Sequence, residues 1–316
     1  MAGKNEPSLE NHQERVPMRM TSMRLELLSR HRIRDPGLGL NEPSGLTLNA
    51  DGSALYTVSD DTKAIFRLDL KGRVSVSDSF FIGLDDLEGI ALRGDDSELL
   101  VVQERSNSVV VVDLNSRSER SRRPLSAMTN YDTIAHHFPD PPDNNGLEGI
   151  TVNTRNNHVV VVKERKPGLL IELDSTLTTI LSTRVLQASQ GFMHPELKAE
   201  KLDFSGLSYD SSSDTLWIVS DKGRCLFQYD WAGDTVLQRL DLTISTGDKP
   251  KRVRKPEGVA IDPDRNRLYM VSDRDGDLHV FRLHTDHLLQ QNKQQKNNNS
   301  LKSESRNGLN QLRHWH

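Results

Sequence analysis

A seven-residue motif built around one glycine occurs five times in this chain and constrains its fold more than any other feature. The copies are EPSGLTL at 42–48, DLEGIAL at 86–92, GLEGITV at 146–152, DFSGLSY at 203–209 and KPEGVAI at 255–261. An apolar run follows each motif and ends in an acidic residue, whose spacing from the motif glycine is the same in every copy. The glycine and its acid are Gly45 and Asp60, Gly89 and Glu104, Gly149 and Glu164, Gly206 and Asp221, and Gly258 and Asp273. Repetition at a fixed spacing indicates an architecture of equivalent units packed side by side.

Each repeat predicts four antiparallel strands. The motif and the apolar run give the first two, and a third short apolar segment follows the acid, as in IFRLD at 65–69. A fourth segment follows in most repeats, for example RVSVSDSFF at 73–81, whereas SRSERSRRPL at 116–125 is a weak strand candidate in the second repeat. Turn clusters such as NADG and SSSD separate the segments, and none of them has a sustained helical period. This pattern is typical of β-propeller blades.

The fifth repeat has only three strands before a polar tail begins. Upstream of the first repeat, MRLELLSRHRI at 23–33 is a strand-like segment with no partner of its own. If this segment supplies the missing strand, the ring closes and no sheet edge stays open. We therefore predict an all-β fold, a five-bladed β-propeller of four-stranded antiparallel blades closed by an N-terminal strand. The expected domains are a disordered segment at 1–22, the propeller at 23–285 and a disordered polar tail at 286–316.

Composition excludes several classes of function. The 41 basic and 45 acidic side chains give a net charge of −4, which favours neither nucleic acid nor a membrane surface as a partner. Cys225 is the only cysteine, so it excludes an internal disulfide and a thiolate metal cluster, and we expect it to be a small buried hydrophobe. The sequence shows no membrane-spanning segment and no signal peptide, so we expect a cytoplasmic monomer.

The repeat also predicts a site. The first strand of a propeller blade lies nearest the axis, and the second strand returns to the end where the first began. The residue before each glycine (the first column) should therefore meet the acid that ends the apolar run (the second column). The pairs are Ser44 and Asp60, Glu88 and Glu104, Glu148 and Glu164, Ser205 and Asp221, and Glu257 and Asp273. Crowded carboxylates must protonate, pair with cations or bind metal.

An oxygen-only donor set suits a hard cation, and calcium accepts such ligands in flexible geometry. We predict calcium as the cofactor and rank the first-column glutamates, Glu88, Glu148 and Glu257, as its ligands. Glu104 and Glu164 share blades with two of them and are further candidates. The alternative for the second column is structural, because four of its acids are followed by a base that offers a turn or a surface salt bridge. Those bases are Arg105, Arg165, Lys222 and Arg274.

Other candidate chemistry is sparse. His136 and His137 lie near Asp140 and Asp143 in an insertion at 126–145, where adjacent histidines suit a base or metal role. A solvated loop is favoured, because no third ligand has a diagnostic spacing. A second insertion covers residues 187–202.

The remaining motifs identify no activity. The chain has no GxSxG, P-loop or HExxH motif. Its basic runs, SRSERSRR at 116–123 and KPKRVRK at 249–255, have no interleaved aromatic residues and are interpreted as solvated loops rather than phosphate contacts.

Together these motifs resemble the bacterial SdiA-regulated propeller family. The stretches NNGLEGI, DFSGL and KPEGVAID are the most similar, and the resemblance covers roughly residues 23–285. It implies a five-bladed propeller with a calcium site, distantly akin to NHL-repeat proteins and to calcium-dependent phosphotriesterases and phytase-like esterase propellers. Because family members commonly have an N-terminal membrane segment or signal, the cell envelope is the alternative location. The resemblance implies no settled activity.

Three functions remain open. The first is a calcium-binding propeller that binds an unknown small molecule or protein at its axial face. The second is a calcium-dependent hydrolase of a phosphoester, ester or lactone, in which the ion polarises the substrate and a carboxylate or histidine acts as base. The third is an interaction scaffold without metal. Fold alone does not choose among them, and no residue can be assigned a catalytic role.

Overall fold

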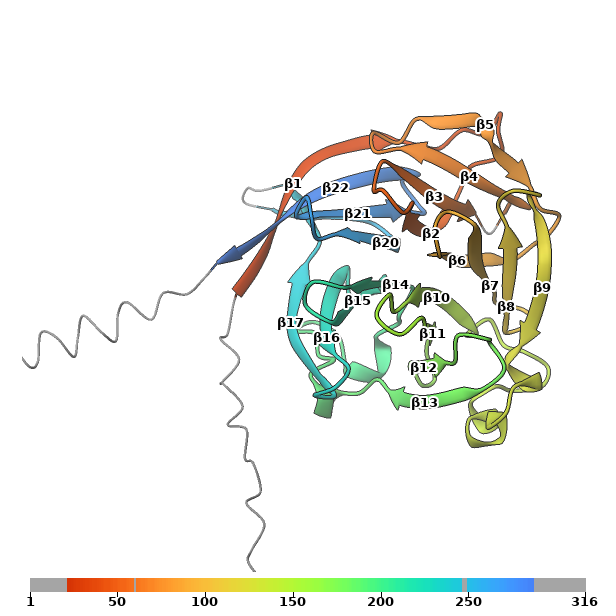
Figure 1. Ribbon diagram of the computed structural model, residues 1–316. Helices are drawn as coiled ribbons and strands as arrows, with labels where there is room; N and C mark the ends of the chain where they lie inside the picture. The colour runs from red at the N-terminus through yellow and green to blue at the C-terminus, as the bar shows by residue number, and fades with distance from the viewer. Residues whose placement is uncertain (1–21, 60, 246–248, 287–316) are drawn as a thin grey trace, which may run out of the picture. The chain divides into compact units, whose positions relative to one another are not determined.

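The computed structural model describes residues 22–59, 61–245 and 249–286, and Met23–His284 form one compact unit. Its strands form five four-stranded antiparallel sheets arranged around a common axis, as Figure 1 shows. The predicted five-bladed β-propeller is therefore confirmed. Asp60 and the two predicted disordered tails, apart from Ser22 and Asp286, lie outside the described residues.

Consecutive strands form the first four blades, and the strand bounds are as follows. Blade 1 contains β2 (Pro43–Leu48), β3 (Ala54–Ser59), β4 (Ala64–Asp69) and β5 (Val74–Phe81). Blade 2 contains β6 (Leu87–Arg93), β7 (Glu98–Gln103), β8 (Ser108–Asp113) and β9 (Ser118–Pro124). Blade 3 contains β10 (Leu147–Val152), β11 (Val159–Lys163), β12 (Leu169–Leu173) and β13 (Ile180–Val185). Blade 4 contains β14 (Gly206–Asp210), β15 (Thr215–Ser220), β16 (Cys225–Asp230) and β17 (Thr235–Asp241).

Blade 5 joins the two ends of the propeller. It contains β20 (Pro256–Asp262), β21 (Arg267–Ser272), β22 (Asp277–Asp286) and, as its outer strand, β1 (Ser22–Arg32). The side chain of Arg30 in β1 donates from Nε to a carboxylate oxygen of Asp277 at 2.5 Å. Just after β1, the backbone N–H of Ile33 donates to the carbonyl of Gly276 at 3.0 Å. The N-terminal segment thus supplies the strand that the fifth repeat lacks, as predicted.

The core lies between the blades, because each strand alternates its side chains between two neighbouring sheets. In β8, Val109 and Val111 belong to the apolar cluster between blades 2 and 3, whereas Val110 and Val112 belong to the cluster between blades 1 and 2. The described residues form five such clusters, one at each junction of the ring. Continuous valine runs therefore mark strands that are buried on both faces.

Polar outer strands and insertions complete the fold. The segment that we regarded as a weak strand forms β9, which is partly exposed and needs no apolar face. The insertions contain short 3-10 helices, and two short strands pair after blade 4. These elements are η1 (Leu125–Ala127), η2 (Tyr131–Thr133), η3 (Ala135–His137), η4 (Ala188–Gln190), η5 (Ala199–Lys201), β18 (Thr243–Ser245) and β19 (Lys251–Arg252). Within the described ranges, no helix has the length and apolar character required to cross a bilayer.

Candidate metal centre

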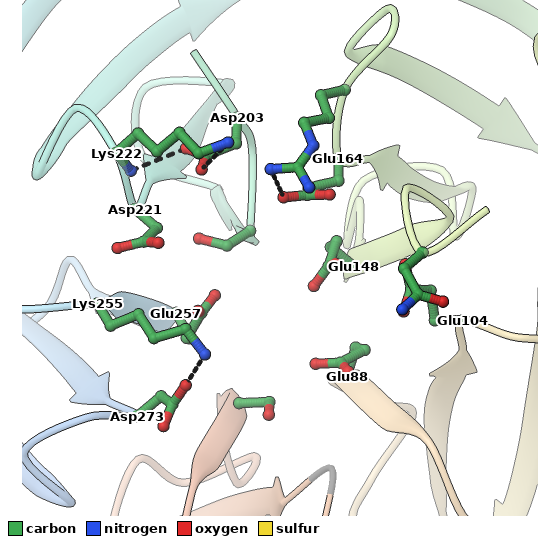
Figure 2. Close-up of a pocket in the computed structure, with 14 residues that line it drawn as sticks. Glu88, Glu104, Glu148, Glu164, Asp203, Asp221, Lys222, Lys255, Glu257 and Asp273 are labelled. Atoms are coloured by element: carbon green, nitrogen blue, oxygen red, sulfur yellow. Dashed lines mark hydrogen bonds and ion pairs between the residues drawn. The ribbon is translucent and has the colours of Figure 1, made fainter. Parts of the chain in front are cut away.

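One cavity of about 270 Å³ lies where all five blades meet, and we call it the axial cavity. Every described residue of the first and second columns lines it. Figure 2 shows the three first-column glutamates pointing toward its centre. Eight carboxylates line the cavity: Glu88, Glu104, Glu148, Glu164, Asp203, Asp221, Glu257 and Asp273. The lining cations are Arg165, Lys222 and Lys255. The predicted convergence of the two columns is therefore present, with a large excess of negative charge.

Irregularities in the inner strands orient the first-column glutamates. The pairing register shifts around Glu88 in β6, around Glu148 in β10 and around Glu257 in β20. A β-bulge lets a side chain leave the ordinary alternation of a strand and point in a new direction. The apolar neighbours Leu87 and Leu147 stay fully buried between the blades, while the glutamates that follow them reach the cavity.

The motif glycines let neighbouring inner strands approach each other closely. A Cβ atom on Gly45 would lie 2.5 Å from the carbonyl oxygen of Glu88 in the next blade. At the closure of the ring, a Cβ on Gly258 would lie 2.6 Å from the carbonyl oxygen of Ser44. Real Cβ atoms do not make such contacts with backbone, so each glycine is required by packing between blades. The glycines therefore set the distance at which the carboxylates face one another.

Backbone hydrogen bonds return the second-column acids to the same end of the ring. The N–H of Glu104 donates to the carbonyl of Asp86 at 3.2 Å, and the N–H of Glu164 donates to that of Gly146 at 2.9 Å. In blade 5 the N–H of Asp273 donates to the carbonyl of Lys255 at 3.1 Å. In each case the acceptor lies three residues before the motif glycine. In these three blades the bonds fix the spacing between the glycine and the acid.

The tightest group of potential ligands lies in blade 2. Asp86, Glu88 and Glu104 each offer an oxygen, and these oxygens lie within 4.8 Å of one another. Asp86 was missed by the sequence analysis, although it stands three residues before its glycine, as Asp203 does in blade 4. Asp203 accepts the N–H of Lys222 at 2.9 Å, and Asp86 likewise accepts the N–H of Arg105. An aspartate three residues before the motif glycine, present in blades 2 and 4, was the signal that could have identified both residues.

Burial and mutual repulsion disfavour ionisation of the glutamates. Burial, followed by the charges of Glu88 and Glu257, raises the pKa of Glu148 well above its usual range. Burial and the charges of Asp221 and Glu88 do the same to the pKa of Glu257. Burial also raises the pKa of Glu164 to about 7, despite the opposing effect of Arg165. A cation in the cavity would relieve this repulsion.

If the second-column acids were purely structural, the basic residue after each acid would pair with that acid. The structure shows this pairing in only one blade. Arg165 does pair with the preceding acid, Glu164, at 2.9 Å. Lys222 instead reaches Asp203 at 3.7 Å, and Asp273 pairs with Lys255 rather than with Arg274. Among the described residues, Arg105 likewise forms no ion pair with the acid that precedes it. The salt-bridge interpretation therefore accounts for one of the four neighbours.

The other candidates lie away from the axial cavity. The rings of His136 and His137 are adjacent, with centroids 3.8 Å apart, but neither lines the cavity or joins the cluster of potential ligands found among the described residues. Cys225 is fully buried, and burial raises the pKa of its thiol to about 12, as expected of an inert core residue.

Fold and site together define a five-bladed β-propeller with an acidic axial cavity. The family model described as SdiA-regulated matches residues 30–276. The chain therefore belongs to the SdiA-regulated family.

Two solved structures are similar to this chain at low sequence identity. Glutaminyl cyclase of Myxococcus xanthus is 12% identical and has a TM-score of 0.58, and the alignment covers 84% of this chain and 98% of the cyclase. The Cps50 (Swd1) β-propeller domain of Myceliophteria thermophila is 10% identical and has a TM-score of 0.46, over 80% of this chain and 99% of that domain. At this identity the cyclase indicates the fold alone.

Proposed function

We propose that the axial cavity binds a divalent cation and that this cation is calcium. The observation that carries the proposal is the position of Glu148. Glu148 is half-buried beside Glu88 and Glu257, and desolvation together with the charges of Glu88, Glu257, Glu104 and Glu164 disfavours its ionisation. A bound cation converts this mutual repulsion into shared attraction.

The donor set fits calcium. The lining offers carboxylate oxygens and the hydroxyls of Ser44 and Ser205, and the cavity lacks any thiol or imidazole from the described residues. Oxygen donors of this kind suit hard cations, and the variable spacing of side chains from five blades suits calcium better than the strict octahedron of magnesium. Glu88, Glu148 and Glu257 would be the principal ligands. Glu104 is the best placed of the second-column acids, because it clusters with Glu88, and Glu164 would be a further ligand.

The propeller would use this ion to bind a ligand at its axial face. Lys222 and Lys255, whose side chains are 43% and 47% exposed, line the cavity and connect it to solvent. A small molecule or a protein side chain entering there would meet both the ion and these amines. The chain would then act as a calcium-dependent binding module.

Hydrolysis is the second candidate function, and one observation favours it. Glu164 lines the same cavity and has a pKa of about 7, which is the range in which a carboxylate serves best as a general base near neutral pH. In such a reaction calcium would supply the polarisation of a phosphoester, ester or lactone oxygen. Hydrolysis of a substrate panel that is lost in chelator and lost in Glu164→Gln would favour this second function over the first.

Thermal unfolding tests the calcium site itself. A cation that binds only the folded protein stabilises it by RT ln(1 + [L]/Kd), about 2.7 kcal/mol at a hundredfold excess over Kd. We expect a higher melting temperature in millimolar calcium than in chelator, and a smaller rise in magnesium. Metal analysis of the purified protein is the companion measurement. Superimposable melting curves for protein shown to be free of metal would contradict the proposal.

A further inference from the structure

A second hollow adjoins the axial cavity between blades 4 and 5, and we call it the basic groove. Its volume is about 630 Å³, and Asp221, Lys222 and Lys255 line both hollows. The cations that line it are Lys201, Lys222, Arg224, Arg254, Lys255 and Arg274. Among the described residues that form this lining, Asp221 is the only acid, and it lies at the boundary with the axial cavity. The two adjoining hollows therefore carry opposite charge.

Half of these cations have no acid to neutralise them. Lys222, Arg254 and Lys255 pair with the aspartates Asp203, Asp275 and Asp273, respectively. Lys201, Arg224 and Arg274 form no ion pair with a carboxylate anywhere in the described part of the chain. Unneutralised charges of one sign in a hollow attract ligands of the other sign.

The backbone at Arg224 shows which substitution can test the role of this side chain. Arg224 has a φ of 47°, in the left-handed region that favours glycine and asparagine. The residues at the equivalent place after the motif glycine in blades 2 and 5 are Asn107 and Gly276, with φ values of 44° and 59°. The equivalent residues of blades 1 and 3 are Lys63 and Pro167, so a long cation at this place is not unique to blade 4. Because Asn107 takes this conformation in blade 2, Arg224→Asn removes the cation without straining the turn.

We infer that the basic groove binds the acidic part of a small ligand that carries at least two anionic groups, phosphate or carboxylate. One group would lie in the groove near Arg224 and Lys201, and the other would reach the cation of the axial cavity past Lys222 and Lys255. This inference names the ligand class of the proposed calcium site and rests on that proposed function. The contribution of the groove, however, depends on its own cations and can be measured without metal.

Calorimetric titration with fructose 1,6-bisphosphate tests the inference, with fructose 6-phosphate as the ligand that has one phosphate. We expect the bisphosphate to bind about tenfold more tightly to the wild type in calcium, because it engages both hollows. Arg224→Asn should weaken its binding at least about threefold, and Arg224→Asn combined with Lys201→Gln should weaken it about tenfold. Arg224→Asn should keep the melting temperature or raise it, because asparagine tolerates the left-handed backbone. Tricarballylate in place of the bisphosphate shows whether carboxylates serve as well as phosphates.

A matched control exists at Arg117. This arginine also has a left-handed backbone, with a φ of 53°, and lies in the turn before β9, outside both hollows. Arg117→Asn therefore makes the same chemical change at the same conformation, and it should leave the affinity for the bisphosphate unchanged. Equal weakening in Arg117→Asn and Arg224→Asn would overturn the inference, since general charge and not the groove would then be responsible.

Repeating the titrations in chelator tests the groove inference separately from the calcium proposal. In chelator the bisphosphate should bind more weakly but should still depend on Arg224. If calcium changes neither affinity nor melting temperature, the metal proposal fails, while the Arg224 dependence still decides the groove. If the wild type and Arg224→Asn bind the bisphosphate equally in both conditions, the groove inference is wrong. Equal affinity for fructose 6-phosphate and fructose 1,6-bisphosphate would overturn the proposed ligand class. Titration with polyglutamates of increasing length is a further test, and an affinity that rises steadily with their length would overturn it as well.

Discussion

The two sides of the axial cavity carry equal numbers of carboxylates but different numbers of cations. Blades 2 and 3 contribute Glu88, Glu104, Glu148 and Glu164, with Arg165 as their lining cation. Blades 4 and 5 contribute Asp203, Asp221, Glu257 and Asp273, together with Lys222 and Lys255. Figure 2 shows both lysines linked to aspartates, whereas the glutamates of blades 2 and 3 mainly face one another.

The difference indicates where a foreign cation is needed. On the side of blades 4 and 5, the protein supplies positive charge to Asp203 and Asp273 through fixed pairs. On the side of blades 2 and 3, Arg165 reaches only Glu164 among the lining carboxylates of that side, and Glu148 is surrounded by acids. We therefore call the side of blades 4 and 5 the neutralised side and the side of blades 2 and 3 the acidic side. A metal should matter most for the acidic side and for Glu257, and much less for the paired Asp203 and Asp273.

The pH dependence of stability in chelator gives the largest expected contrast. The pKa of Glu164 is about 7 when folded, against an ordinary value of 4.5. As pH rises from 4.5 to 7, the unfolded chain releases this proton while the folded protein holds it, so the free energy of unfolding falls. The loss should be on the order of 2 kcal/mol, with allowance for the water that still reaches the carboxyl.

Urea unfolding of the wild type and Glu164→Gln at several pH values isolates this effect. The comparison between the two proteins is needed because His279, whose pKa is lowered to about 4 by burial, has the opposite dependence. In chelator, Glu164→Gln should gain stability over the wild type as pH rises from 5 to 8. Parallel profiles for the two proteins would show that Glu164 on the acidic side carries no such penalty.

Lys255→Met tests the neutralised side and should have the next largest effect. It leaves Asp273, whose side chain is only 6% exposed, without its paired cation. Because Lys255 itself is 47% exposed, we expect a loss of about 2 kcal/mol rather than the larger cost of breaking a fully buried pair. Urea unfolding in chelator measures this loss, and calcium should recover part of it.

Lys222→Met is the matched control for Lys255→Met. Its amine lies 3.7 Å from Asp203, which also accepts hydrogen bonds from the hydroxyl of Ser220 at 3.0 Å and the N–H of Lys222 at 2.9 Å. Since those two bonds remain, the loss should be smaller than for Lys255→Met. The reverse order would mean that the pairs of the neutralised side do not act as the structure indicates.

Arg165→Gln should have the smallest effect. The side chain of Arg165 is 30% exposed and pairs with Glu164, whose pKa of about 7 leaves it only partly ionised at pH 7. We expect a loss of about 0.5 kcal/mol in chelator at pH 7, typical of an exposed ion pair. Thermal melts measure it. A loss as large as that of Lys255→Met would remove the distinction between the two sides.

Most of the fold was predictable from the sequence, because the repeated residues are the ones that strand packing and backbone hydrogen bonding require. The motif glycines must admit a neighbouring strand, and a backbone bond holds the acid that ends the apolar run in blades 2, 3 and 5, so both positions are constrained by distance. The strand at 23–33 was predictable because a propeller needs a partner for its last strand. β9 was harder to predict, since an exposed outer strand carries no apolar pattern.

The partners within the site were less predictable. Lys222 and Arg165 both follow a second-column acid, yet Lys222 selects Asp203 and Arg165 selects its own neighbour. For Lys222 the choice depends on where the side chain three residues before the motif glycine of its own blade points, which spacing alone does not determine. Asp86, by contrast, was predictable from its spacing, because it lies three residues before its glycine, as Asp203 does. The ligand role of Glu88, Glu148, Glu257, Glu104 and Glu164 stays a prediction.

Replacement of Glu148 by glutamine tests the central claim most directly. The change keeps the volume and one oxygen but removes the charge, which a calcium ion should feel strongly. In calcium, Glu148→Gln should therefore lower the melting temperature relative to the wild type. In chelator, the same change relieves repulsion from Glu88 and Glu257, so the melting temperature should stay unchanged or rise. A decrease of equal size in both conditions would contradict the account, because Glu148 would then be a structural residue and not a ligand.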